Sequence, residues 1–107
     1  LGDVYKRQLT KLSTQKGVRA GYLLDVSKAG SYQMIFKMHS GENPFAQLPV
    51  SIFVNGVLQQ TTTFNGTDNK IIERAVTISF TESGENQLTL FFGESGVRMD
   101  EILLVQE

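Results

Sequence analysis

Residues 31–39 read "SYQMIFKMH", and this short stretch sets the fold class. Large apolar side chains alternate with smaller or polar ones at a period of two, which is the period of a β-strand. One face of such a strand is apolar and the other is polar, as in an antiparallel sheet that covers a core on one side only. The apolar face consists of Tyr32, Met34, Phe36 and Met38.

Similar short segments recur on both sides of this strand, separated by turns rich in Gly and Asn. Asn55-Gly56 is the dipeptide that a type I′ hairpin prefers, because both central residues need positive φ. About seven strands result, and they predict an all-β, antiparallel β-sandwich of immunoglobulin or jelly-roll type. Residues 9–17 are ambiguous between a strand and a loop. The predicted strands are 21–26, 31–39, 49–54, 57–64, 71–80, 87–92 and 97–106.

Composition excludes several classes of protein. The 107 residues suffice for one domain, with a formal net charge of −1. Neither that charge nor any local run of basic residues fits a nucleic-acid partner. There is no cysteine, hence no disulfide and no thiolate zinc site. No apolar run approaches the length that a bilayer-spanning helix needs, so no membrane partner is expected.

The first eight residues, "LGDVYKRQ", look foreign to the rest of the chain. They resemble the translation of a sequencing adaptor, and we interpret residues 1–8 as non-native and 9–107 as one β-sandwich domain. This interpretation predicts poor packing of residues 1–8. It also predicts an unpaired sheet edge where an N-terminal strand is missing.

Three stretches resemble carbohydrate-binding modules of family 6 and its relatives, families 35 and 36. They are "YLLDVSKAGSYQMIFKM" (22–38), "VSIFVNGVLQ" (50–59) and "SGENQLTLFFGESGVRMDEILL" (83–104). The resemblance covers roughly residues 20–105 and implies a β-jelly-roll that binds a polysaccharide or oligosaccharide without catalysis. It further implies a secreted, extracellular protein in which the module is tethered to a glycoside hydrolase. Among the residues we find no catalytic constellation, and we expect no enzyme.

In that family the sugar site lies in the loops at one end of the sandwich, where aromatic rings stack on the apolar face of a pyranose. The corresponding loops here are 65–70 and 94–98. The chain has no Trp, and Arg98 stands where the family has an Asn. A forked guanidinium can bind hydroxyls or the carboxylate of an acidic sugar, although a salt bridge or a solvated strand end is the commoner role. The predicted ligand-binding residues are Arg98, Asn69, Asp68, Phe64 and Phe45.

Asp100 matches a family position that helps to bind a structural calcium. Calcium takes six to eight oxygen ligands, and the matching glutamates do not occur before Gly17. Asp100 is therefore a candidate calcium ligand without identified partners. Asp100 and Glu101 are adjacent, so a regular strand places them on opposite faces, which excludes a glycosidase pair. We expect His39, the only histidine, to face solvent at a strand end.

A second interpretation stays open. The chain can be a structural or adhesion spacer of a multidomain bacterial surface protein, without a sugar site. The missing Trp and the Arg98 position favour the spacer, whereas the strand order and the closing "MDEILL" favour glycan binding. The roles of Phe45 and Phe64 separate the two, because a buried ring cannot stack on a sugar.

Overall fold

The computed structural model describes the backbone of residues 4–13 and both backbone and side chains of residues 17–107. These parts of the chain form eight β-strands and no helix. The strands are β1 (Val4–Ser13), β2 (Arg19–Val26), β3 (Gly30–His39), β4 (Gln47–Val54), β5 (Val57–Asn65), β6 (Ile72–Phe80), β7 (Gly84–Phe92) and β8 (Arg98–Gln106).

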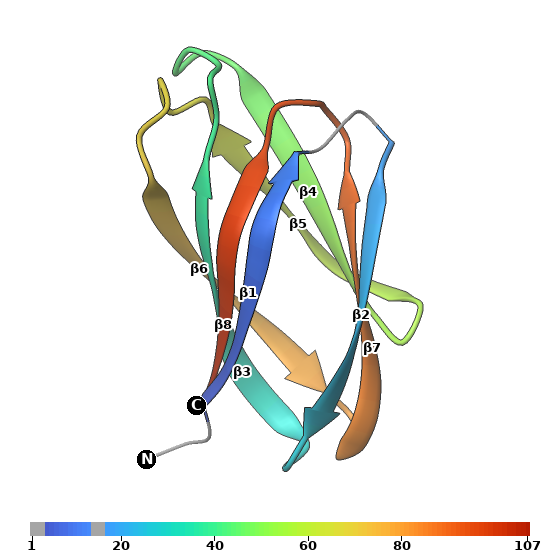
Figure 1. The fold of residues 1–107 in the computed structure, drawn as a ribbon. Coiled ribbons are helices and arrows are strands. Elements are labelled where there is room, and N and C mark those ends of the chain that lie inside the picture. Colours follow the sequence, from blue (N-terminus) through green and yellow to red (C-terminus); the bar gives the residue numbers. More distant parts are fainter. Residues whose placement is uncertain (1–3, 14–16) are drawn as a thin grey trace.

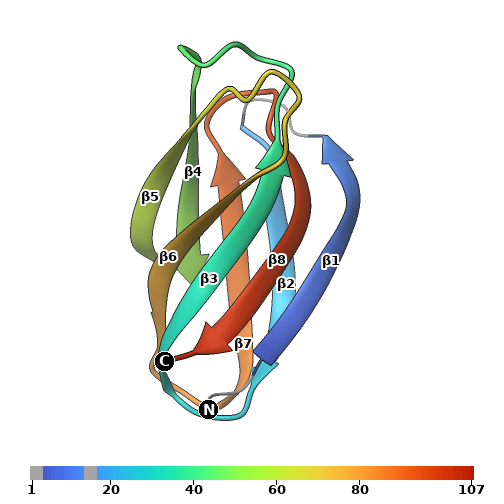
Figure 2. The same ribbon diagram turned by 90° about the vertical axis from the view of Figure 1, so that its left-hand side faces the viewer.

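The strands form two four-stranded antiparallel sheets that pack face to face (Figures 1 and 2). Sheet A has the order β1-β8-β3-β6, and sheet B has the order β2-β7-β4-β5. Every strand-to-strand connection except β4–β5 crosses from one sheet to the other, which is the jelly-roll arrangement of two Greek keys. The prediction of an antiparallel sandwich is confirmed, and the jelly-roll alternative is the correct one.

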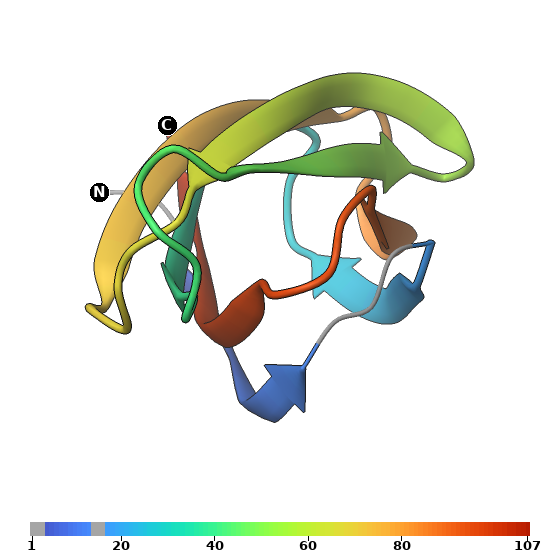
Figure 3. The ribbon, with the colours of Figure 1, turned by 90° about the horizontal axis from the view of Figure 1, so that it is seen from above.

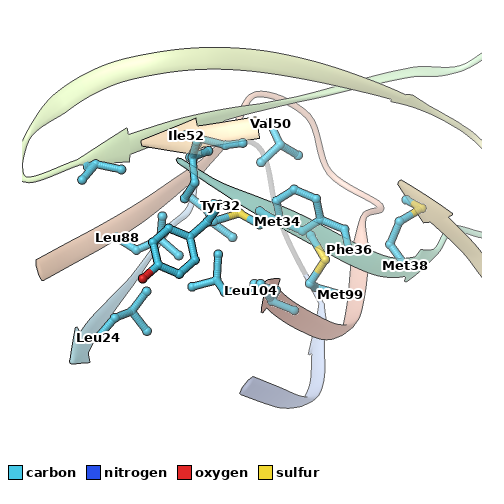
Figure 4. Close-up of a cluster of buried hydrophobic side chains, with 14 of the residues drawn as sticks. Leu24, Tyr32, Met34, Phe36, Met38, Val50, Ile52, Leu88, Met99 and Leu104 are labelled. Atoms are coloured by element: carbon cyan, nitrogen blue, oxygen red, sulfur yellow. The ribbon is translucent and has the colours of Figure 1, made fainter. Parts of the chain in front are cut away.

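Alternation along each strand builds the core between the sheets. The four apolar residues predicted for β3 all point inward, and Met34, Phe36 and Met38 are fully buried (Figure 4). Tyr32 is buried too, and its hydroxyl donates to the carbonyl of Lys28 at 2.7 Å, so the phenol keeps a partner. Sheet B contributes the opposite layer through Val50, Ile52, Leu88 and Leu90.

The turn between β4 and β5 follows the sequence prediction. Asn55 and Gly56 have φ of 50° and 82°, as the two central residues of a type I′ turn require. The Asn55 amide also donates to the side-chain oxygen of Asn86 at 2.8 Å. The hairpin is thereby joined to β7, its neighbour in sheet B.

A β-bulge in β8 changes where two acidic residues point. Lys37 pairs with Glu101 and Met38 pairs with Met99, so Asp100 is an extra residue in β8. Met99 and Ile102 are both buried, three positions apart rather than two. Asp100 and Glu101 consequently share the outer face, and the expectation of opposite faces is wrong.

The position beside β8 is occupied by β1, which is itself an edge strand of sheet A, so a missing strand beyond it stays a prediction. β1 pairs with β8 from Val4 opposite Val105 to Ser13 opposite Arg98. Ladder hydrogen bonds use only backbone groups, so strand pairing demands little of the side chains. Whether the side chains of residues 1–8 pack poorly lies outside the described residues, and the non-native origin of these residues stays a prediction.

Within residues 4–13 and 17–107, the structure contains no helix that is long and apolar enough to cross a bilayer.

Candidate functional site

Three connections meet at one end of the sandwich: residues 40–46 after β3, 66–71 after β5 and 93–97 after β7. We call them the apical loops, and Figure 3 looks down on them. Four of the five predicted ligand-binding residues lie at this end: Phe45, Asp68, Asn69 and, at the first position of β8, Arg98. Jelly-roll connectivity brings them together, because every second connection ends here.

Backbone hydrogen bonds join the first two apical loops. The amide of Asp68 donates to the carbonyl of Glu42 at 3.0 Å, and the amide of Asn69 donates to that of Ser40 at 2.7 Å. Asp68 and Asn69 both adopt positive φ, which Asp and Asn tolerate better than most residues. Their exposed side chains therefore stand on a backbone that the neighbouring loop holds in place.

Thr67 fastens the same two loops from inside. Its hydroxyl accepts a hydrogen bond from the Ser40 amide at 2.9 Å and donates to the Ser40 carbonyl at 3.1 Å. Ser40 is fully buried and Thr67 is nearly so. No local signal in the sequence predicts this clamp, since a threonine after Asn-Gly has the ordinary composition of a turn.

Gly66 allows the loops to approach closely. A Cβ atom at this position would lie 2.0 Å from the carbonyl oxygen of Asn43 and 2.5 Å from that of Glu42. Real Cβ atoms do not come so near to backbone oxygens, so any larger residue forces the loops apart. Glycine is needed here for space.

Phe45 is presented to solvent on this fixed support. Its side chain is 92% exposed, the highest value among the large exposed apolar residues. Its amide donates to the side-chain oxygen of Asn43 at 2.9 Å, and the amide of Ala46 donates to the Asn43 carbonyl at 3.1 Å. These bonds form a tight turn that holds the ring out from the sandwich, where stacking on a ligand is possible.

Phe64 belongs to the core, and its prediction as a surface platform is corrected. Its ring is fully buried and packs edge-on against Phe36, with ring centroids 5.7 Å apart. The Arg74 guanidinium covers the ring on the remaining side, 5.2 Å from its centroid, and donates to the Thr63 carbonyl at 2.7 Å. Phe64 precedes the loop in sequence, but strand alternation turns its side chain inward.

Arg98 is exposed at the first position of β8, with its backbone opposite His39 of β3. Within the described part of the chain, the structure records no salt bridge for its guanidinium. The salt-bridge role considered for Arg98 therefore has no described carboxylate to support it. Arg98, Asn69 and Phe45 share this end of the molecule.

Glu42 of the first apical loop lies against Gly96 of the third. A Cβ atom on Gly96 would lie 3.3 Å from Cγ of Glu42 and 3.5 Å from Oε1. The Glu42 amide donates to the hydroxyl of Ser40 at 3.0 Å. No local signal marks this carboxylate, because its position depends on loops about fifty residues apart.

Asp100 lies just below the apical loops, and its carboxylate is already bonded. Oδ2 is 2.8 Å from Nδ1 of His39, and the two side chains are 28% and 23% exposed. His39 is thus a half-buried partner of Asp100, which corrects the expectation of a histidine facing solvent. Among the residues described, no group of three or more acidic or histidine side chains gathers, so this part of the chain does not fit calcium by itself. The calcium site stays a prediction that depends on residues before Gly17.

Comparison with solved structures places the fold. No family model matches the chain. A family 35 carbohydrate-binding module from Clostridium thermocellum superposes with a TM-score of 0.76, covering 99% of this chain and 92% of the other at 18% identity. This chain has the fold of a family 35 carbohydrate-binding module. The family 35 module of Abf62 from Cellvibrio japonicus gives a TM-score of 0.81 at 14% identity, over 96% of this chain and 93% of that one.

A curated relative is similar in sequence as well. It is a β-glucosidase from Ruminococcus albus, 30% identical over 95 residues, which are 89% of this chain. The match spans only 10% of the length of that enzyme. The similarity therefore concerns a small part of the β-glucosidase and does not by itself transfer the activity of the whole enzyme.

Proposed function

We propose that this chain is a non-catalytic carbohydrate-binding module whose glycan site is formed by the apical loops. The observation that carries the proposal is Phe45, a 92% exposed ring on loops held by Ser40 and Thr67. Exposing a large apolar ring to water is unfavourable, so a partner that stacks on it gains free energy. A pre-ordered loop loses little entropy on binding, which raises affinity further.

Polar groups around the ring supply the directional part of recognition. Asp68 and Glu42 offer carboxylate acceptors, Asn69 offers an amide that both donates and accepts, and Arg98 offers a fork of donors. A sugar presents an apolar C–H face together with hydroxyls that donate and accept. The apical loops match both features with one ring and several polar side chains.

The relatives suggest the wider setting. Because the match to the R. albus β-glucosidase covers a tenth of that enzyme, we propose that the module is tethered to a glycoside hydrolase. We further propose that it acts outside the cell, where polysaccharides are met. In that setting it would raise the concentration of substrate near the catalytic domain.

The proposal is tested by binding of the 107-residue chain to a glycan array, followed by calorimetry with the best oligosaccharide. Phe45→Ala is expected to weaken binding about tenfold or more, equivalent to about 1.4 kcal/mol, because the stacking surface is lost. The thermal unfolding midpoint should not change, since an exposed ring contributes little to the folded state.

Val57→Ala is the matched control. Val57 is 66% exposed in the β4–β5 hairpin, at the opposite end of the sandwich, and its loss should leave binding unchanged. No binding to any neutral or acidic glycan, or equal effects of the two variants, would refute the apical site. Silence on the array would instead support the spacer interpretation, which the burial of Phe64 also favours.

A further inference from the structure

The outer faces of the two sheets differ in character. On sheet A, cross-strand ion pairs lie at the end of the outer face near the apical loops: Lys37 Nζ lies 3.6 Å from Glu73 and 3.9 Å from Glu101, and His39 is bonded to Asp100. Farther along this face Ile35 and Leu103 are paired and only partly exposed. Sheet B has no recorded ion pair on its outer face within the residues described.

Large apolar side chains are exposed near the middle of the sheet B face, with Gln87, Thr89 and Ser51 beside them. Leu23 of β2 is 61% exposed and Leu58 of β5 is 53% exposed, while Phe53 and Phe91 are partly exposed between them. Phe53 is paired with Leu58 on one side and with Thr89 on the other, so the apolar residues lie on neighbouring strands. Contiguous apolar surface on a folded domain commonly marks an interaction site.

Charges stand only at the two ends of this face. Arg19 lies at one end, with its guanidinium 5.3 Å from the centre of the Phe91 ring. Asp25 and Glu85 lie at the other end, directly opposite each other across β2 and β7. Like charges in such a pair repel, and neither carboxylate has an ion pair in the described residues. A cation placed between them would relieve the repulsion.

We propose that the sheet B face binds a second copy of this chain through a two-fold axis. Arg19 and Asp25 are six residues apart on β2, or about 20 Å along the strand. A two-fold axis through the middle of the face places the Arg19 end of each copy over the Asp25 and Glu85 end of the other. The apolar middle of one face then covers that of its mate.

The same face fits a sugar less well. Its most exposed apolar residues, Leu23 and Leu58, are aliphatic and offer no ring for stacking. The Arg19 guanidinium already occupies one face of Phe91. A four-stranded face of this length measures roughly 20 Å by 25 Å, which is smaller than a standard stable interface of about 800 Å² per partner. We therefore expect a weak dimer, in the micromolar to millimolar range.

Sedimentation velocity and light scattering of the 107-residue chain test the proposal, over concentrations from micromolar to millimolar and at low salt. The expected result is a reversible shift from the monomer mass to twice that mass. Leu23→Asp should raise the dissociation constant at least tenfold, because it places an unpaired carboxylate in the apolar centre. Ile71→Asp is the matched control: Ile71 is 65% exposed, lies in an apical loop and should leave the dimer intact.

Charge reversal tests the two-fold arrangement itself. Arg19→Glu alone should weaken the dimer about tenfold, since it brings acidic groups of both copies together. Combining it with Asp25→Lys and Glu85→Lys should restore the dimer, because every charge at the interface is then inverted. Within one copy, residue 19 lies about 20 Å along the strand from residue 25, too far for the reversed charges to pair with each other. Restored dimerisation must therefore come from charges on the second copy.

Two outcomes would overturn the proposal. One is a monomer at every concentration, in a chain whose circular dichroism and thermal unfolding show it to be folded. The other is oligosaccharide binding that Phe53→Ala abolishes and Phe45→Ala leaves intact, since this result assigns the face to a glycan. The first outcome leaves the apical site untouched, because that site is tested by glycan binding of the Phe45→Ala variant. The second outcome refutes the apical site as well, because binding would then not depend on Phe45.

Discussion

Phe45 and Phe64 show how much the position of a single residue decides. Both rings flank loops at the same end of the sandwich, and the sequence offers both as sugar platforms. Phe64 lies on β5 at an inward position of the alternation and is fully buried, whereas Phe45 lies in a turn and is 92% exposed. In a strand, the alternation of the pleat determines to which face of the sheet a side chain points, whereas no such alternation applies in a turn.

Gly66→Ala is a prediction at this scale. The added methyl group would meet the carbonyl oxygens of Asn43 and Glu42 and push the apical loops apart. We expect the free energy of unfolding to fall by about 1–3 kcal/mol, measured by urea denaturation, with weaker glycan binding.

Gly41→Ala serves as the control for Gly66→Ala. Its Cβ would meet only the Asn69 side-chain oxygen, at 3.4 Å, and the loops can accommodate that contact. A similar loss of stability in both variants would contradict the steric explanation. The loss would then come from adding a methyl group to any glycine in these loops, and not from the close contacts at Gly66.

At the scale of elements, irregularities in two strands place side chains that a regular strand would misplace. In β8 the extra residue Asp100 puts its carboxylate beside His39. In β5 the extra residue is Gln59, because Ile52 pairs with Gln60 and Phe53 pairs with Leu58. The Gln59 amide reaches β6, where it accepts from the Ser79 amide at 2.9 Å and donates to the Ser79 carbonyl.

β5 and β6 lie beside each other along one side of the sandwich (Figure 2), and the Gln59 side chain bridges them. The Gln59 side chain forms hydrogen bonds with both the amide and the carbonyl of Ser79 on β6, the edge strand of sheet A. A neighbouring strand would bond to the same backbone groups. Gln60 and Arg74 add further bonds along the same side. Edge strands with satisfied backbone groups are poor templates for aggregation.

Gln59→Ala should remove both hydrogen bonds to Ser79 at once. We expect a loss of about 1–2 kcal/mol in unfolding free energy, given about 1 kcal/mol for each bond. Hydrogen exchange of the Ser79 amide should accelerate as well, because its acceptor is gone.

Gln87→Ala is the comparison for this measurement. Gln87 is also exposed. Its backbone amide donates to the side-chain oxygen of Asn55, but its own side chain has no recorded bond in the described residues. If both variants lose equal stability, the bonds to Ser79 contribute nothing beyond side-chain truncation.

At the scale of the whole molecule, the chain joins its two ends. β1 and β8 are neighbours in sheet A, with Val4 opposite Val105, and only β4 and β5 are joined by a short hairpin within one sheet. Most strands therefore pair with strands that are distant in sequence. Bringing such distant segments together costs chain entropy before their contacts can form. The two faces of the finished sandwich differ, since the ion pairs recorded in the described residues lie on sheet A and the most exposed strand leucines, Leu23 and Leu58, lie on sheet B.

This topology predicts slow folding for a chain of 107 residues. Stopped-flow refolding should take milliseconds to seconds, as in other all-β domains with non-local pairing. Val57→Ala and other changes in the local β4–β5 hairpin should affect refolding less than changes in β3, whose partners β6 and β8 are distant in sequence. Folding within microseconds would contradict the prediction.

Local patterns in the sequence were sufficient for the seven strands from β2 to β8, the inward face of β3 and the Asn55-Gly56 turn, but not for β1. A period of two and a need for positive φ are properties of neighbouring residues, so they can be recognised without a partner strand. Tyr32, Met34, Phe36 and Met38 were assigned to the core in this way, and all four are buried. The resemblance to family 6 and family 35 modules added the loops in which a sugar site was to be sought.

Pairing between distant segments decided the rest. Whether Phe64 faces the core, whether Asp100 meets His39 and whether Thr67 fastens Ser40 depend on which strands and loops become neighbours. The bulge in β8 follows from the same cause, because Met99 and Ile102 must both reach a core that sheet B completes. Such contacts arise from the free energy of packing two sheets together, and no short stretch of the chain contains that information.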